Sequence, residues 1–260
     1  MIICRKCMTS TGFSALCRRQ ASRIPNKPRG VVDAFLDEQS KKENEWLTDD
    51  HIRALILNIV TGAYLGPLQD VRSLFLFLAH HPEVVRKIQR EIDENIGERL
   101  PESKDRSSLP HAEATVMEIL RLASNLSIPH QTNGDVNLDG FVVPKGCKVY
   151  SATFMFHHDP EVWGDPDAFR PQRFIDDTGR LVPSSHPLRQ HYLPFGAGRR
   201  LCPGDNLTRV YMFLFVTTLL QKFDILPPVE HELLPLRIDS WEDKLSFEVK
   251  PHHLIFRKRK

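Results

Sequence analysis

One cysteine stands in a glycine-rich segment whose residue types could hold a metal ion. Residues 195–204 read Phe-Gly-Ala-Gly-Arg-Arg-Leu-Cys-Pro-Gly, so Cys202 follows Arg200 closely and comes just before an apolar stretch of helical character. A thiolate needs positive potential around it, and the N–H groups of a glycine-rich turn and of a helix N-terminus supply it. This segment, called here the cysteine loop, therefore favours a deprotonated sulfur that can act as a ligand.

The other residues of the cysteine loop fit a large, flat ligand. Gly198 and Gly204 allow unusual backbone angles and a close approach of the main chain to such a ligand. Phe195 can pack beneath it, and Arg200 can pair with an acidic substituent on it. A cysteine that is simply buried in a tight turn is the alternative, because free cysteine is often a core residue.

A second set of charged residues lies upstream of the cysteine loop. Glu118 and Arg121 are three residues apart in a segment of helical periodicity that Pro110 opens, so they share one helix face and can form an ion pair. Arg173 follows in a proline-containing stretch. An ordinary surface salt bridge is the alternative for Glu118 and Arg121.

Taken together, these motifs resemble those of the cytochrome P450 family. The cysteine loop matches the pattern F-x-x-G-x-R-x-C-x-G in full, residues 118–121 match E-x-x-R, and the likeness extends from about Lys27 to the end of the chain. It looks like the microsomal drug- and steroid-hydroxylase branch. The resemblance implies that the Cys202 thiolate is the axial ligand of haem b, iron protoporphyrin IX. It also implies that Glu118, Arg121 and Arg173 form a structural triad that supports the loop.

The resemblance assigns further residues to the haem and to the substrate. It makes His130 and Arg200 candidate partners of the haem propionates, although a solvated loop histidine is the alternative for His130. Phe195, Gly198 and Gly204 complete the cofactor-binding set. The residues expected to line the substrate are Ala63, Leu65, Gly66, Ser127 and Ile128.

The segment that should carry a proton relay departs from the family pattern. Aligned on His81-Pro82, residues 62–66 read Gly-Ala-Tyr-Leu-Gly where the family usually has A-G-x-[DE]-T. Leu65 and Gly66 have no group that can pass a proton. This departure keeps open an isomerase or lyase of the P450 type that works without a proton relay.

The resemblance implies a monooxygenase that inserts one oxygen atom from O2 into a small apolar or steroid-like substrate. Electrons would come from NADPH through a flavoprotein reductase, docked where Arg199, Arg209 and the segment containing Arg86, Lys87 and Arg90 offer positive charge. Family chains are longer, so we expect an amino-terminally truncated chain. A non-catalytic isoform or an incomplete gene product is a further alternative.

Composition narrows the class of protein. The 260 residues are 41% hydrophobic and 26% charged, which is ordinary for a globular chain. A net charge of +2, with no basic stripe, argues against nucleic-acid binding. The five cysteines suggest a reducing compartment rather than a disulfide framework. Three histidine doublets, at residues 80–81, 157–158 and 252–253, lack metal-ligand spacing and are interpreted as surface or loop histidines.

Membrane association is expected from the resemblance and not from an anchor. No apolar run reaches the roughly 20 residues that span a bilayer. The resemblance points to the cytosolic face of the endoplasmic reticulum, with peripheral contact through apolar faces left uncovered. Residues 1–32 contain seven Lys or Arg and no acid, which is the composition of a transit peptide and leaves the mitochondrion as an alternative.

The expected fold is mainly α with small β elements, corresponding to the carboxy-terminal half of the cytochrome P450 fold. Residues 1–26 form a basic segment of unassigned origin, and residues 27–260 form a partial cytochrome P450 domain. Apolar periodicity predicts helices over residues 31–44, 52–79, 83–96, 110–122 and 206–222, the second of them long and weakened in its centre by Pro67. Short strands are expected within 136–150, and an ordered coil rich in proline over 160–194.

Overall fold

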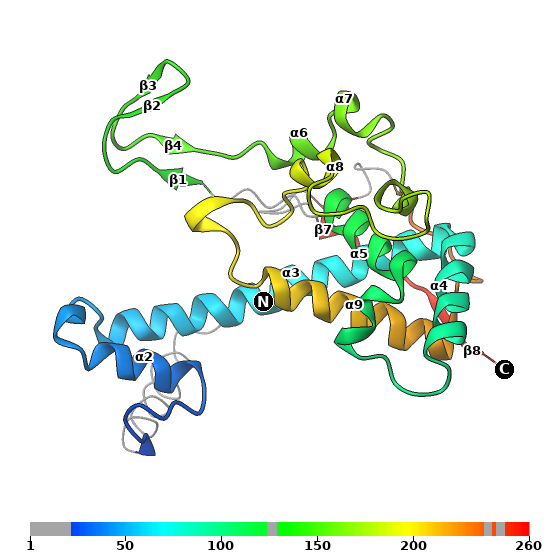
Figure 1. Ribbon diagram of the computed structural model, residues 1–260, viewed down its shortest axis with the longest axis horizontal. Coiled ribbons are helices and arrows are strands. Elements are labelled where there is room, and N and C mark those ends of the chain that lie inside the picture. The colour runs from blue at the N-terminus through cyan, green and yellow to red at the C-terminus, as the bar shows by residue number, and fades with distance from the viewer. Residues whose placement is uncertain (1–21, 124–128, 237–240, 243–247, 260) are drawn as a thin grey trace. The chain divides into compact units, whose positions relative to one another are not determined.

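The computed structural model describes residues 22–123, 129–236, 241–242 and 248–259 (Figure 1). It is mainly α-helical with small two-stranded sheets, as predicted. The α-helices are α2 (Val31–Gln39), α3 (Asp49–His80), α4 (Pro82–Asn95), α5 (Pro110–Ala123), α6 (Thr153–His157), α7 (Pro160–Trp163), α8 (Pro187–Gln190) and α9 (Asp205–Lys222). The 3-10 helices are η1 (Lys42–Asn44), η2 (Ser103–Ser107), η3 (Pro171–Phe174) and η4 (Gly198–Arg200). The strands are β1 (His130–Gln131), β2 (Val136–Leu138), β3 (Phe141–Val143), β4 (Lys148–Val149), β5 (Phe223–Leu226), β6 (Trp241–Glu242), β7 (Glu248–Val249) and β8 (Ile255–Lys258).

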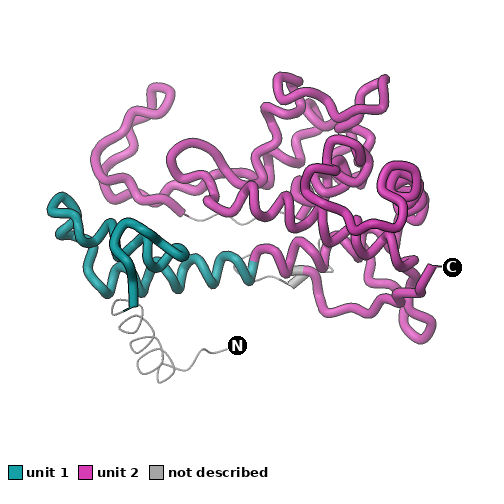
Figure 2. The backbone as a smooth tube through the Cα atoms, turned by 60° about the horizontal axis from the view of Figure 1, so that its bottom comes forward, with its two compact units in different colours: residues 1–65 teal, residues 66–260 magenta. Residues whose placement is uncertain are grey.

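The chain divides into two compact units, residues 1–65 and 66–260 (Figure 2). In the first unit, α2 and the start of α3 enclose a small apolar core of Leu36, Leu47 and Ile52. Thr48 caps α3, because its hydroxyl oxygen accepts a hydrogen bond from the main-chain N–H of His51 at 3.4 Å. The cap starts the long helix at Asp49, three residues before the start predicted from apolar periodicity.

Helix α3 continues through the centre that the sequence marked as weak. Residues 49–80 form one helix with Pro67 inside it. Proline removes one main-chain donor from a helix, but flanking turns with good apolar packing can hold the helical path on either side. After Pro67 this packing is provided by Leu74, Leu76 and Leu78, which are fully buried in the second unit.

Helix α5 lies in the core of the second unit. Every residue from Ala112 to Ala123 is buried, and the helix packs against α4, α9 and η3. Helix α4 directs Val84, Ile88 and Ile92 into the same core, because the i, i+4, i+8 spacing puts them on one face. The helix that carries E-x-x-R is thus enclosed by its neighbours.

The small sheets are antiparallel pairs: β1 with β4, β2 with β3, β5 with β8 and β6 with β7. The hairpin from β2 to β3 turns at Asp139 and Gly140, which have φ values of 48° and 87°. An Asp-Gly pair with both φ angles positive is the preferred two-residue hairpin turn. Among the described residues, no helix has both the length and the apolarity needed to cross a membrane.

Candidate functional site

Cys202 lies in an exposed loop between η4 and α9. Its main-chain N–H donates to the Phe195 carbonyl oxygen at 2.9 Å, and its carbonyl oxygen accepts from the N–H of Asp205 at 3.3 Å. Gly196 and Gly198 have φ values of 76° and 70°, in the left-handed region that favours glycine. Because Cys202 is exposed, the structure does not support the alternative of a cysteine buried in a tight turn.

A glycine lies beside the sulfur, and two exposed leucines lie near it in the sequence. A β-carbon at Gly204 would lie 3.7 Å from the Cys202 sulfur, so any larger residue there would occupy space beside it. Leu201 and Leu207 flank the cysteine in sequence and are 45% and 69% exposed. The start of α9, an 18-residue helix, adds the positive end of the helix dipole. The loop therefore presents its thiol in a setting that suits an apolar ligand with a metal centre.

Arg209 contacts Phe195 at the start of the cysteine loop. Its guanidinium carbon lies 5.1 Å from the ring centroids of both Phe195 and Tyr192, and its side chain pairs with Asp205 one turn earlier on α9. Such cation–π contacts stabilise the position of an aromatic ring. Arg209 is predicted above to belong to a docking face, but its partly buried charge pairs with Asp205 within the chain. The spacing of Asp205 and Arg209, i and i+4, is the sequence feature that could have indicated this.

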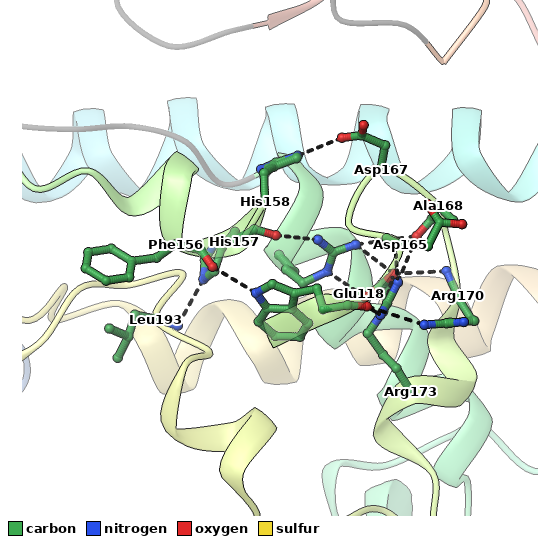
Figure 3. A network of polar contacts seen from close by, with 12 residues as sticks. Glu118, Phe156, His157, His158, Asp165, Asp167, Ala168, Arg170, Arg173 and Leu193 are labelled. Atoms are coloured by element: carbon green, nitrogen blue, oxygen red, sulfur yellow. Dashed lines mark hydrogen bonds and ion pairs between the residues drawn. The ribbon is translucent and has the colours of Figure 1, made fainter. Parts of the chain in front are cut away.

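Glu118 holds the two arginines of the triad in the core (Figure 3). The Glu118 carboxylate accepts from Nε and Nη2 of Arg121, each at 2.9 Å, and from Nε of Arg173 at 3.0 Å. The main-chain N–H of Arg170 adds a fourth donor at 2.9 Å. The side chains of Glu118 and Arg121 are fully buried, so the alternative of a surface salt bridge is wrong.

The remaining N–H groups of the triad bind main-chain carbonyls of the coil. Nη1 of Arg121 donates to the His157 carbonyl oxygen at 2.6 Å, while Arg173 donates to the carbonyls of Trp163 at 2.8 Å and Asp165 at 2.9 Å. Burial lowers the pKa of Arg173, and the Glu118 charge opposes that shift. The triad therefore fastens the coil of residues 157–173 to α5.

His157 contacts both the triad and the segment before the cysteine loop. It was interpreted as a surface or loop histidine, but it is fully buried at the end of α6. Its ring Nε2 accepts a hydrogen bond from the main-chain N–H of Leu193 at 3.0 Å. Burial, with smaller contributions from Arg121 and His158, lowers the pKa of His157 to about 4. No local pattern marked this residue, because Arg121 and Leu193 are each 36 positions away from it.

The two predicted partners of the haem propionates are exposed. His130 lies in β1 opposite Val149, and Arg200 ends η4. In the described part of the chain, no ion pair is formed by either side chain, so both can meet an external carboxylate. No group of three or more His, Cys, Asp or Glu side chains gathers there to form a metal site.

The predicted substrate-lining residues are only partly described. Ala63 and Leu65 lie on exposed turns of α3 in the first unit, and Gly66 begins the second unit. Ser127 and Ile128 lie outside the described residues. Leu65 and Gly66 occupy helical positions without any proton-bearing group, as the sequence indicated. Their assignment to a substrate pocket stays a prediction.

Comparison with known proteins decides the family. The family model "Cytochrome P450" matches residues 8–256. The chain belongs to the cytochrome P450 family. It is 41% identical over 185 residues to "Steroid 17-alpha-hydroxylase/17,20 lyase" of Squalus acanthias, a stretch that covers 70% of this chain and 36% of that protein. It is 35% identical over 246 residues to "Cytochrome P450 2L1" of Panulirus argus, which covers 92% of this chain and 49% of that protein.

These similarities confirm the recognition made from the motifs. The chain spans between about a third and a half of the length of the curated relatives it matches. Cytochromes P450 hold haem iron through a cysteine thiolate. The exposed Cys202, the glycine-framed loop and the exposed side chains of His130 and Arg200 fit that cofactor, since they offer one soft ligand and two hydrogen-bond partners for acidic substituents.

We expect Glu118→Gln to lower the free energy of unfolding by about 3–5 kcal/mol, because it leaves two buried guanidinium groups without their carboxylate. Urea unfolding of the chain measures the change. As a control, Glu38→Gln removes a carboxylate that is 51% exposed and pairs with Lys41, and it should cost less than about 1 kcal/mol. Equal losses in the two variants would contradict the structural role of the triad.

Taken alone, the low pKa of His157 should make the free energy of unfolding fall in mild acid. The unfolded ring takes up a proton near its ordinary value of 6.5, whereas the folded ring does so near 4, so the free energy of unfolding decreases from about pH 6.5 to pH 4. The full loss is about 3 kcal/mol for this shift. Burial raises the pKa of Asp70 to about 7. The Asp70 contribution to the free energy of unfolding therefore increases as the pH falls over the same range. The His157→Gln variant isolates the histidine, and an unchanged pH slope in it would contradict the expectation.

Proposed function

We propose that this chain is part of a haem-thiolate monooxygenase that inserts one oxygen atom from O2 into an apolar organic substrate. The observation that carries the proposal is the exposed Cys202 thiol, which lies at the start of α9 within a complete family motif. When bound, haem supplies the activation of dioxygen with electrons that originate from NADPH. The roles below are those of this chain's own residues.

Some residues would hold the cofactor directly, and others support the loop that would hold it. Cys202 provides the thiolate, and the main-chain bond to Phe195 keeps its peptide in place. Arg200 and His130 would hold the propionates of the haem by charge-assisted hydrogen bonds. The triad keeps the coil that leads to the cysteine loop fixed to α5, which sets the loop's position without touching the cofactor.

A flavoprotein reductase is proposed as the electron donor. Its docking face would include Arg199 near the cysteine and the exposed residues Arg86 and Arg90 on α4. Arg209 is not part of this face, because it pairs with Asp205. Exposed cations attract an acidic partner over several ångströms and speed its association.

A second candidate function is an isomerase or lyase of the same family. It is favoured by Leu65 and Gly66, which stand where the family usually has an acid and a threonine. Neither side chain can hold or move a proton, so a reaction that requires no proton delivery would tolerate them. Uptake of O2 coupled to NADPH oxidation by the reconstituted protein distinguishes a monooxygenase from this alternative.

The proposed substrate is a small apolar or steroid-like molecule. The relative from Squalus acanthias is named a steroid hydroxylase and lyase, and it is 41% identical over the shared region. We further propose that the protein works at the cytosolic face of the endoplasmic reticulum, with peripheral membrane contact. Exposed apolar side chains such as Phe141 and Val142 on the β2–β3 hairpin are consistent with such contact.

Replacing Cys202 with Ser should abolish the thiolate-type red-shifted Soret band of the reduced, CO-treated chain with haem, because serine is not a soft anionic ligand. Cys147→Ser is the matched control: it removes the other described free cysteine and should keep the band. A red-shifted band in the Cys202 variant would disprove this ligand assignment. No such band in the unaltered chain would favour a non-catalytic product.

Reversing two charges on α4 should slow electron delivery. We expect Arg86→Glu combined with Arg90→Glu to reduce the rate of reductase-dependent haem reduction at low salt by about tenfold, and the difference should shrink as ionic strength rises. Lys145→Glu with Lys148→Glu alters two other exposed cations and serves as the control. Stopped-flow absorbance measures the rate. An identical rate in both double variants would rule out α4 as a docking element.

A further inference from the structure

His157 joins the triad to the cysteine loop through two hydrogen bonds on opposite ends of one residue (Figure 3). On the main-chain side, its carbonyl oxygen accepts from Nη1 of Arg121 at 2.6 Å. On the side-chain side, its Nε2 accepts from the N–H of Leu193 at 3.0 Å. One residue thus contacts both the arginine that Glu118 holds and the segment that leads into the loop.

Main-chain hydrogen bonds connect the segment around Leu193 to Cys202. Its carbonyl oxygen accepts from the N–H of Gly196 at 3.1 Å, which fixes the turn at the start of the cysteine loop. Phe195 lies within that turn, and its carbonyl oxygen accepts from the N–H of Cys202 at 2.9 Å. The main chain of Leu193 is therefore hydrogen-bonded through both its N–H and its carbonyl just before the loop that presents the sulfur.

The histidine ring is held in one orientation by its neighbours. It lies 6.2 Å from the Tyr192 ring in a stacked arrangement and 6.2 Å from the Trp163 ring edge-on. The Trp163 indole N–H donates to the Phe156 carbonyl oxygen at 2.8 Å, so the indole is itself fixed. Rotation of the imidazole would disturb both aromatic contacts.

The Nδ1 atom of His157 indicates that this histidine does more than fill space in the core. Among the described residues, Nδ1 of His157 has no hydrogen-bond partner although it is buried. Because Nε2 is an acceptor, a neutral ring carries its proton on Nδ1, and a buried donor without a partner is unfavourable. An apolar residue would avoid that cost, so what histidine adds at this position is the acceptor for Leu193.

We propose that His157 is a positioning residue, which uses the Nδ1–H tautomer to set the place of the cysteine loop relative to the triad. The role in orienting a metal ligand rests on the proposed haem-thiolate function. The hydrogen-bond relay itself belongs to the chain and can be measured without haem.

The test compares His157→Leu with His157→Gln. Leucine fills similar space without an acceptor, whereas the Gln Oε1 atom can reach about the position of the imidazole Nε2 and accept from Leu193. In the haem-free chain, we expect amide hydrogen exchange at Leu193 and Cys202 to be about tenfold faster in the leucine variant, as for the loss of one hydrogen bond. Exchange in the glutamine variant should stay within about threefold of the unaltered chain.

A spectroscopic measurement tests whether the hydrogen bonds of His157 affect the proposed metal ligand. With haem and CO, the leucine variant should show a smaller fraction of the thiolate-type Soret band, and the glutamine variant should restore it. Equal behaviour of the two variants, or faster exchange at Leu193 without any change at Cys202, would overturn the proposal. If the unaltered chain gives no thiolate-type band, the proposed function fails, while the exchange result still decides the relay.

A measurement on the unaltered chain covers the case in which the leucine variant does not fold. Nitrogen-15 NMR of the labelled histidine ring should show an unprotonated Nε2 and a protonated Nδ1 at neutral pH. A protonated Nε2 cannot accept from Leu193, so that result would refute the proposal without any substitution.

Discussion

The buried carboxylate of Glu118 is the interaction on which the rest of the second unit depends. A carboxylate removed from water is stable only when nearly all its lone pairs are satisfied by strong donors. Arg121 and Arg173 provide two cations, and the N–H of Arg170 provides a further donor. Since these donors come from α5, η3 and the coil, no one of these elements can move without exposing a buried charge. The coil of residues 157–173 is therefore ordered although it contains little regular structure.

The residues that support the cysteine loop are distinct from the residues proposed to bind the cofactor. The triad and His157 are buried, whereas Cys202, Arg200 and His130 are exposed. Main-chain hydrogen bonds at Leu193 and Phe195 connect the two sets. A reactive group at the surface is held in a defined place when residues locked by packing carry it. The loop gains its geometry from the core and leaves its sulfur accessible.

The cysteine loop follows the family pattern, whereas the segment expected to relay protons does not. The cysteine loop keeps every position of the family motif, whereas Leu65 and Gly66 replace the expected acid and threonine. Holding a cofactor and delivering protons to it are separate tasks, carried out by separate side chains. Under the proposed function, the chain has candidate residues for the first task, and for the second it lacks the usual pair.

The sequence by itself determined the family, the positions of α4, α5 and α9 and the members of the triad. These features depend on local periodicity or on short motifs, which neighbouring residues define. Only the tertiary structure decided that Glu118 is fully buried, since the i, i+3 pair of Glu38 and Lys41 has the same spacing and is exposed. It also decided the role of His157, whose partners are 36 residues away in both directions. Desolvation and long-range hydrogen bonds arise from contacts between distant segments, so no local pattern encodes them.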